Sequence, residues 1–146
     1  MTQLALIVGT TMGGAEAVAD ELAEKLQTQG IDAEIHLSPE LETLKQTPNW
    51  LVVTSTHGAG ELPDNLQPLA KSLECVDLSS IRYAICGIGD SSYDTFCGAA
   101  KTVEELLQQN GATELVNKIE IDVQSLELPE DKALLWIDQL IPILNP

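Results

Sequence analysis

The sequence predicts an α/β fold, a single doubly wound domain over residues 1–146 with a five-stranded parallel sheet in the order 2-1-3-4-5. Three observations predict it. Short apolar runs alternate with amphipathic helical patterns, which is typical of a parallel sheet covered by helices on both faces. Several runs are continuously apolar, as in strands buried on both faces. Three of these runs lead directly into segments rich in glycine and hydroxyl residues.

The five strands are expected at residues 4–8, 33–37, 50–53, 82–86 and 118–123. Residues 4–8 contain no polar side chain, so this strand is expected in the middle of the sheet. His36 alternates with apolar neighbours and is expected to be exposed or half-exposed. Cys86 lies in an apolar run and is expected in the core. Residues 118–123 alternate strictly between polar and apolar, the pattern of a half-exposed edge strand.

The helices are expected at residues 14–29, 65–73, 98–110 and 129–144, with a short helical turn at 41–45. In the first helix, apolar residues recur at spacings of three and four, and Gly30 ends it. Pro68 and Pro129 lie in first turns, where proline is tolerated because the N–H it lacks has no partner there. Gly111 ends the helix at 98–110.

Composition limits the class of protein. The chain is 44% apolar, and no apolar run approaches the roughly 20 residues that cross a bilayer or resembles a signal peptide. We therefore expect a soluble cytoplasmic protein. Three cysteines without a C-x-x-C spacing indicate reduced thiols rather than a disulfide framework or a metal site.

The chain is strongly acidic, with 23 acidic and 7 basic residues and a net charge of −16. This charge argues against nucleic acid and anionic membranes as partners, since both bind basic surfaces. It favours a basic protein partner that is steered electrostatically. Charge alone equally fits a role in solubility.

The first polar segment consists of Thr10, Thr11, Met12, Gly13, Gly14 and Ala15. Its hydroxyl and N–H groups precede a helix N-terminus, and together these form an anion site. A Walker loop is excluded because no lysine precedes Lys25, and the glycine spacing does not fit a dinucleotide fingerprint. The segment fits a terminal phosphate held by neutral donors, or equally a strand-to-helix turn without a ligand.

The second polar segment contains Ser55, Thr56, His57, Gly58, Ala59 and Gly60. Gly58 and Gly60 allow the backbone to approach a ligand closely and its peptides to flip. His57 has a ring that can stack on a planar ligand. Taken alone, a single histidine in a loop is more often an ordinary exposed residue.

The third polar segment contains Gly89, Asp90, Ser91, Ser92, Tyr93, Phe96 and Cys97. Tyr93 fits a cover over a planar ligand, or a lid over the core. Phe96 is expected to point to the core, and Cys97 to pack there or lie near the ligand. The three segments follow strands 1, 3 and 4, beside the switch point where open α/β sheets bind ligands. A phosphate cradle, a glycine-flanked ring site and a tyrosine loop, in that order, predict FMN as the cofactor.

These segments resemble the flavodoxin family, in particular its short-chain MioC-type group and the FMN domain of diflavin reductases. The resemblance implies a flavodoxin-like fold in which Thr10, Thr11 and the N–H groups through Ala15 hold the FMN phosphate. It implies that His57 and Tyr93 lie on the two ring faces and that the Gly58 carbonyl accepts a hydrogen bond from the semiquinone. It also implies that the backbone of residues 89–92 meets the pyrimidine end. Met12 and Ala15 replace threonines found in many flavodoxins, so two phosphate hydroxyls are absent.

The predicted function is an FMN-binding one-electron carrier, not an enzyme. It would shuttle electrons from a basic flavoprotein reductase to a redox enzyme through the semiquinone and hydroquinone. The resemblance suggests an acceptor in biotin synthesis. Two alternatives remain: a flavin-dependent NAD(P)H reductase of a small molecule such as a quinone, and a cofactor-free interaction module.

Overall fold

The structure is a computed structural model that describes residues 2–10, 13–56, 60–92 and 96–145. Its strand segments are β1 (Thr2–Gly9), β2 (Ile31–His36), β3 (Asn49–Ser55), β4 (Arg82–Gly89), β5 (Thr113–Glu114) and β6 (Ile119–Asp122). Its helices are α1 (Gly14–Thr28), α2 (Leu41–Leu44), α3 (Gln67–Ser72), α4 (Gly98–Gln109), α5 (Pro129–Ile137) and α6 (Ile141–Leu144), and a 3₁₀ turn at Asp64–Leu66 precedes α3.

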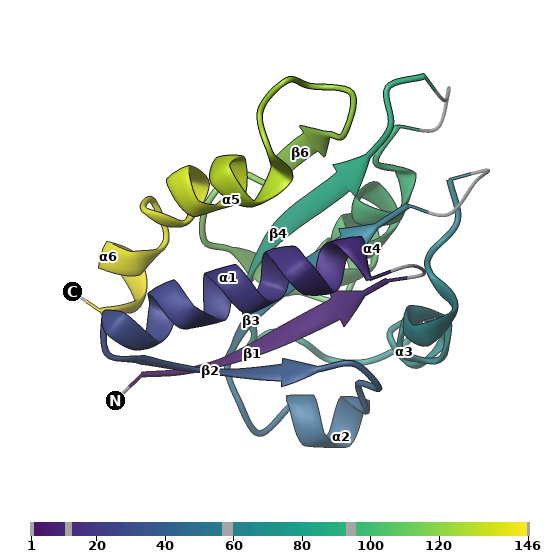
Figure 1. Cartoon of the computed structure of the whole chain (residues 1–146). Helices are drawn as coiled ribbons and strands as arrows, with labels where there is room; N and C mark the ends of the chain where they lie inside the picture. Colours follow the sequence, from purple (N-terminus) through teal and green to yellow (C-terminus); the bar gives the residue numbers. More distant parts are fainter. Residues whose placement is uncertain (1, 11–12, 57–59, 93–95, 146) are drawn as a thin grey trace.

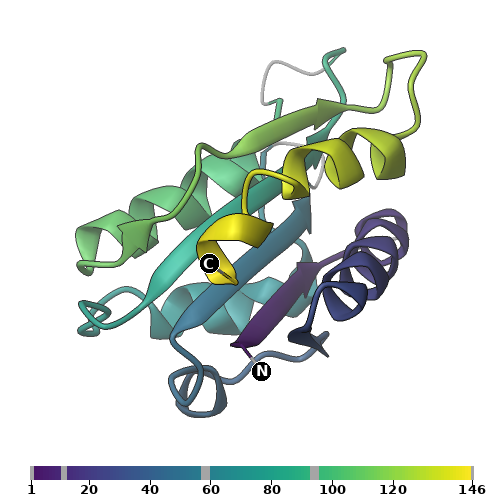
Figure 2. The same ribbon diagram turned by 90° about the vertical axis from the view of Figure 1, so that its left-hand side faces the viewer.

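The strands form one parallel sheet in the order β2-β1-β3-β4, with β5 and β6 both paired to the outer side of β4. This confirms the predicted order. Helices α1 and α5 cover one face of the sheet, and α3 and α4 cover the other (Figures 1 and 2). No helix in the described part of the chain is long and apolar enough to cross a membrane.

Two hydrophobic clusters, one on each face of the sheet, form the core. Alternate residues of β1 belong to different clusters: Leu6 packs under α1 and α5, while Ile7 packs under α3 and α4. Cys86 is fully buried, as expected, and His36 is half-buried at the outer strand. Successive side chains of a strand point to opposite faces, so continuously apolar strands fill both layers.

Strand β4 is three residues longer than predicted, because residues 87–89 continue it to Gly89. A Cβ on Gly87 would lie 2.6 Å from the Cβ of Ala100 in α4. The glycine there allows α4 to approach the sheet closely, instead of beginning a loop.

The fifth position of the sheet is divided between two short segments, β5 and β6, where one strand at residues 118–123 is predicted. Leu115 and Val116, between the two segments, both pack against the cluster under α1 and α5. Neighbouring residues of a regular strand face opposite sides, so the chain leaves the ladder to bury both.

The helix predicted at residues 129–144 is wrong in its second half: α5 ends at Ile137 and α6 begins at Ile141. Pro142 has no N–H to donate, and its ring conflicts with the carbonyl of Asp138. The backbone N–H groups of Gln139 and Leu140 instead donate to Trp136 and Ile137, three residues back.

Candidate functional site

The three polar segments begin beside one another at the carboxyl edge of the sheet. Gly9 of β1 pairs with Thr54 of β3, and Thr54 pairs with Gly87 of β4. The Ser55 hydroxyl donates to the Gly9 carbonyl at 3.3 Å. In Figure 1 the ends of β1, β3 and β4 point the same way. The structure therefore brings together segments that are far apart in the sequence.

Asn65 supports the first segment. Its Oδ1 accepts the Thr10 N–H at 3.0 Å, and its Nδ2 donates to the carbonyls of Val8 (2.6 Å) and Leu37 (2.9 Å). One side chain thus joins the end of β1 to the end of β2. Sequence reasoning missed Asn65, because nothing local distinguishes it from an ordinary polar residue at the start of a helix.

Gly9 is buried where β1 ends. A Cβ there would overlap the side chains of Leu66 and Thr54. Only a residue without a side chain fits, because the turn before α3 packs directly on the backbone. Close packing therefore fixes the position of the backbone at Gly9, where the first segment begins.

The N-terminus of α1 has an open arrangement of donors. Gly13 adopts the left-handed conformation with φ at 87°, and its N–H donates to the Thr10 hydroxyl at 2.8 Å. Among the described residues, no side chain caps this helix, and no atom lies within 4 Å of a Cβ placed on Gly13 or Gly14. The first N–H groups of a helix lack partners within it and carry its positive end.

These donors suit a phosphate group. Thr10 supplies a hydroxyl group that can donate, no described atom fills the space beside the two glycines, and Ala15 is buried in the first turn. Residues 9–16 contain no lysine or arginine, and Glu16 lies in the first turn. An anion here would be held by neutral donors and the helix end rather than by an ion pair.

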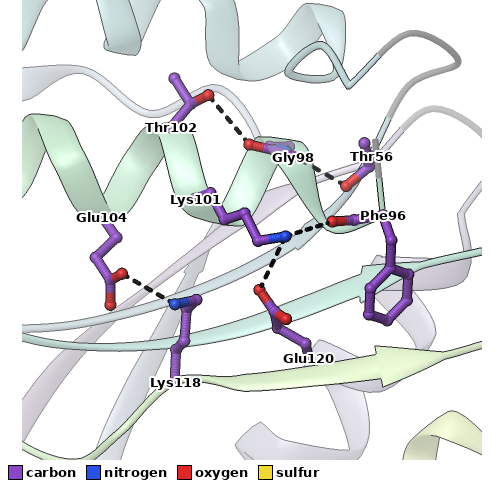
Figure 3. A network of polar contacts seen from close by, with 9 residues as sticks. Thr56, Phe96, Gly98, Lys101, Thr102, Glu104, Lys118 and Glu120 are labelled. Atoms are coloured by element: carbon purple, nitrogen blue, oxygen red, sulfur yellow. Dashed lines mark hydrogen bonds and ion pairs between the residues drawn. The ribbon is translucent and has the colours of Figure 1, made fainter. Parts of the chain in front are cut away.

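The second segment lies against the start of α4, directly after the third segment. A Cβ on Gly98 would lie 2.9 Å from the Gly60 carbonyl oxygen, and Gly60 itself has a φ of 88°. The Thr56 hydroxyl accepts the N–H of Ala99 at 3.4 Å, at the start of α4 (Figure 3). The second segment is thus held against the first turn of α4, the helix that follows the third segment.

Cys97 is buried at the end of the third segment. It caps α4 in the left-handed conformation, with φ at 53°. A Cβ on Gly89 would lie 2.8 Å from the Cys97 N and 3.1 Å from the Phe96 ring, which is only partly buried. Burial raises the pKa of Cys97 to about 12, and the Glu120 carboxylate adds to the rise. The thiol therefore stays protonated and packs as an apolar group.

Lys101 links the third segment to β6, at the edge of the sheet, through a hydrogen bond and an ion pair. Its Nζ donates to the Phe96 carbonyl at 3.0 Å and lies 3.8 Å from Glu120 Oε2 on β6 (Figure 3). A second ion pair, Lys118 with Glu104 at 3.0 Å, joins α4 to the chain before β6. Sequence reasoning missed Lys101, since its two partners are brought together only by the fold.

Two partly exposed carboxylates order the tip of the third segment. Asp122 accepts the N–H groups of Ser91 (3.1 Å) and Gln124 (2.9 Å). Asp90 accepts the N–H (2.9 Å) and hydroxyl (2.6 Å) of Ser92, and the Gln124 amide at 3.1 Å. Hydrogen bonds from Ser92 lower the pKa of Asp90, and those from Ser91 and Gln124 lower the pKa of Asp122. Both groups are therefore acceptors in their ionised form.

Six of the predicted site residues lie outside the described residues: Thr11, Met12, His57, Gly58, Ala59 and Tyr93. Their roles, including the two ring-facing side chains, stay predictions. The other thirteen lie at the carboxyl edge as expected, and their contacts with a ligand are likewise predictions. In the described part of the chain, no three His, Cys, Asp or Glu side chains gather closely enough to hold a metal ion.

Known proteins resemble this chain over nearly its whole length. A family model described as Flavodoxin matches residues 6–136. Protein MioC of Escherichia coli K12 is 42% identical over 147 residues, covering 99% of this chain and 100% of its own. The MioC homolog of Haemophilus influenzae is 44% identical over 140 residues, covering 94% and 96%. The solved structure of a cysteine-to-serine mutant of flavodoxin from Pseudomonas aeruginosa has a TM-score of 0.91 at 34% identity, covering 99% and 100%.

Proposed function

The chain belongs to the flavodoxin family and is an FMN-binding electron carrier, and we propose that it moves electrons singly from a flavoprotein reductase to a redox enzyme. The observation that carries this proposal is the meeting of three polar segments at the ends of β1, β3 and β4. FMN supplies the redox chemistry when bound, and the protein positions it and adjusts its potential.

The residues at the phosphate end would bind by neutral donors. We assign the phosphate to the Thr10 hydroxyl, which itself accepts the Gly13 N–H, and to the N–H groups of residues 14 and 15 at the start of α1. The assignment is supported by the helix dipole and by the absence of any described atom within 4 Å of a Cβ at Gly13 or Gly14. Since residues 9–16 contain no lysine or arginine, the affinity of this segment for the phosphate depends on how well these donors are held in place.

The residues at the ring end would bind largely through backbone. We assign the ring to the space bounded by the second segment, including Ser55 and Thr56, and by residues 89–92 of the third. Support comes from the contact between Gly60 and Gly98 and from the hydrogen bonds that order Asp90. Preordered backbone groups bind at little conformational cost.

The net charge of the chain would affect both the choice of reductase and the reduction potential of the bound FMN. A net charge of −16 favours a basic reductase as the electron donor, because the negative charge would steer a basic protein toward this one. The same charge disfavours adding further negative charge at the site, so full reduction should need a low potential. An acceptor in biotin synthesis and a cytoplasmic location, both expected from the sequence, stay predictions.

A potentiometric titration of the FMN-loaded protein tests the proposal. We expect two separate one-electron steps, seen as an intermediate absorbance spectrum between the oxidised and the fully reduced spectra. A single two-electron step without an intermediate would contradict a one-electron carrier. Mixing with NADPH alone is the control: rapid bleaching without a reductase would favour the alternative of an NAD(P)H-dependent flavoenzyme.

A further inference from the structure

We propose that residues 123–128, the loop between β6 and α5, form an apolar docking element for a basic redox protein. We call these residues the docking loop. The inference rests on the proposed function, which it deepens by naming the surface that meets the partner. The loop is outside the three polar segments and makes no part of the assigned FMN site.

The docking loop displays large apolar side chains to water. Leu126 is fully exposed, Leu128 is 60% exposed and Val123 is 47% exposed. Among the described residues, only six large apolar side chains are exposed, and these three lie within one six-residue loop. Single exposed apolar side chains are ordinary, but a concentration of them marks a surface that binds another molecule.

Hydrogen bonds link the docking loop to the end of β4 and to the third polar segment. The Val123 N–H donates to the Gly89 carbonyl at 2.8 Å, at the end of β4. Asp122, just before the loop, accepts the Ser91 N–H, and Gln124 within the loop donates to both oxygens of Asp90. In Figure 1 the loop after β6 lies beside the chain that leaves β4. A partner that binds here would therefore sit next to the residues assigned to the ring end.

The loop is also held internally, which lowers the cost of binding. The N–H of Gln124 donates to the Asp122 carboxylate, the N–H of Ser125 to the Asp122 carbonyl at 3.0 Å, and the N–H of Glu127 to the Ser125 hydroxyl at 3.3 Å. A surface that is ordered before it binds loses less conformational entropy in the complex.

The charges around the docking loop identify the occupant. Residues 120–131 carry five acidic side chains and no basic one; Lys132, which follows, is the single basic residue from 119 to the C-terminus. Exposed apolar side chains interspersed with acidic residues fit a protein whose apolar contact surface is surrounded by lysine and arginine. A second copy of this chain, also at −16, and an anionic membrane would both be repelled.

The test compares three FMN-loaded proteins: the wild type, Leu126→Ser, and a control, Ile143→Ser. Ile143 is also an exposed apolar residue, in α6, which meets the start of β1 through the bond from Thr2 to Leu144. The probe is a purified bacterial NADPH-dependent flavodoxin reductase. We expect Leu126→Ser to raise the KM of the reductase for the carrier about tenfold, as loss of an apolar anchor does. FMN affinity and the midpoint of thermal unfolding should not change, and Ile143→Ser should match the wild type.

Hydrogen exchange of the wild type with and without the reductase gives a second, independent measurement. We expect protection of the amides of residues 123–128 in the complex, and none at α6. Equal KM values for the two variants, or no protection of the loop, would overturn the inference while leaving the proposed function intact. A wild type that the reductase cannot reduce would instead contradict the proposed function. If the wild type is a dimer and Leu126→Ser is a monomer, the docking loop binds a second copy of this chain. That result would also overturn the inference.

Discussion

The two ends of the candidate FMN site are built in different ways. At the phosphate end, Gly9 is enclosed by buried side chains, and the Asn65 amide holds Thr10 through uncharged hydrogen bonds. At the ring end, the partly exposed carboxylates of Asp90 and Asp122 order the loop tip. Packing and neutral hydrogen bonds respond little to pH or salt, whereas exposed charged acceptors respond to both. The site therefore combines a fixed phosphate end with a ring end that depends on ionisation.

The largest effect is expected from Gly9→Ala, which places a Cβ among the side chains of Leu66 and Thr54. Overpacking of a close-packed site costs about 1–3 kcal/mol. We expect the free energy of unfolding of the apoprotein, measured by urea denaturation, to fall by this amount. An unchanged value would mean that packing does not set the phosphate end.

Gly14→Ala is the matched control for this variant. No described atom lies within 4 Å of a Cβ at Gly14, which is exposed at the first position of α1. We expect the same denaturation measurement to show a gain of at most about 1 kcal/mol, because alanine loses less backbone entropy in a helix than glycine does.

The next largest effect is expected from Asn65→Ala, a variant that tests whether Asn65 positions the donors for the phosphate. Asn65→Ala removes three hydrogen bonds and leaves the Thr10 N–H without its acceptor, so we expect a loss of about 1–3 kcal/mol of stability. The affinity of the apoprotein for FMN, measured by fluorescence quenching, should fall with it. Retained affinity in a folded variant would remove Asn65 from the phosphate end.

A smaller effect is expected at the ring end from Lys101→Met, which keeps the apolar stem but loses the bond to the Phe96 carbonyl and the pair with Glu120. Because the side chain is 54% exposed, stability should fall by at most about 1 kcal/mol. We expect a drop in FMN affinity that the charge-matched control Lys71→Met, on α3, does not show. Equal affinities of the two variants would mean that the lysine does not hold the third segment.

The smallest effect is a pH dependence limited to the ring end. The pKa values of Asp90 and Asp122 are lowered in the fold, so their contribution is present above the ordinary carboxyl pKa of about 4 and is lost as the pH falls through the lowered values. We expect the amides of Ser91 and Gln124 to keep their protection from hydrogen exchange at about pH 4 and to lose it at lower pH, as the pH falls through the lowered pKa values. The amide of Thr10 should keep its protection, and a simultaneous loss at Thr10 would contradict the contrast between the two ends.

The candidate site was predictable in its outline but not in its supports. The three polar segments and their order after strands 1, 3 and 4 are visible in the sequence, because glycine and hydroxyl residues directly follow apolar runs. The supports are not visible, because they are long-range: Asn65 bonds a residue 55 positions earlier, and Lys101 meets a carboxylate on another strand. The break between α5 and α6 is an intermediate case, since Pro142 carries a local signal that the apolar periodicity obscures.

By itself, the sequence determined the strand order and the edge at which the polar segments gather, because apolar periodicity and turn residues act locally along the chain. Only the tertiary structure decided that β4 runs on to Gly89, that the fifth strand divides, and that Asp122 and Gln124 hold the third segment. These features depend on how closely one element can approach another, and the distances between elements arise only when the whole chain packs.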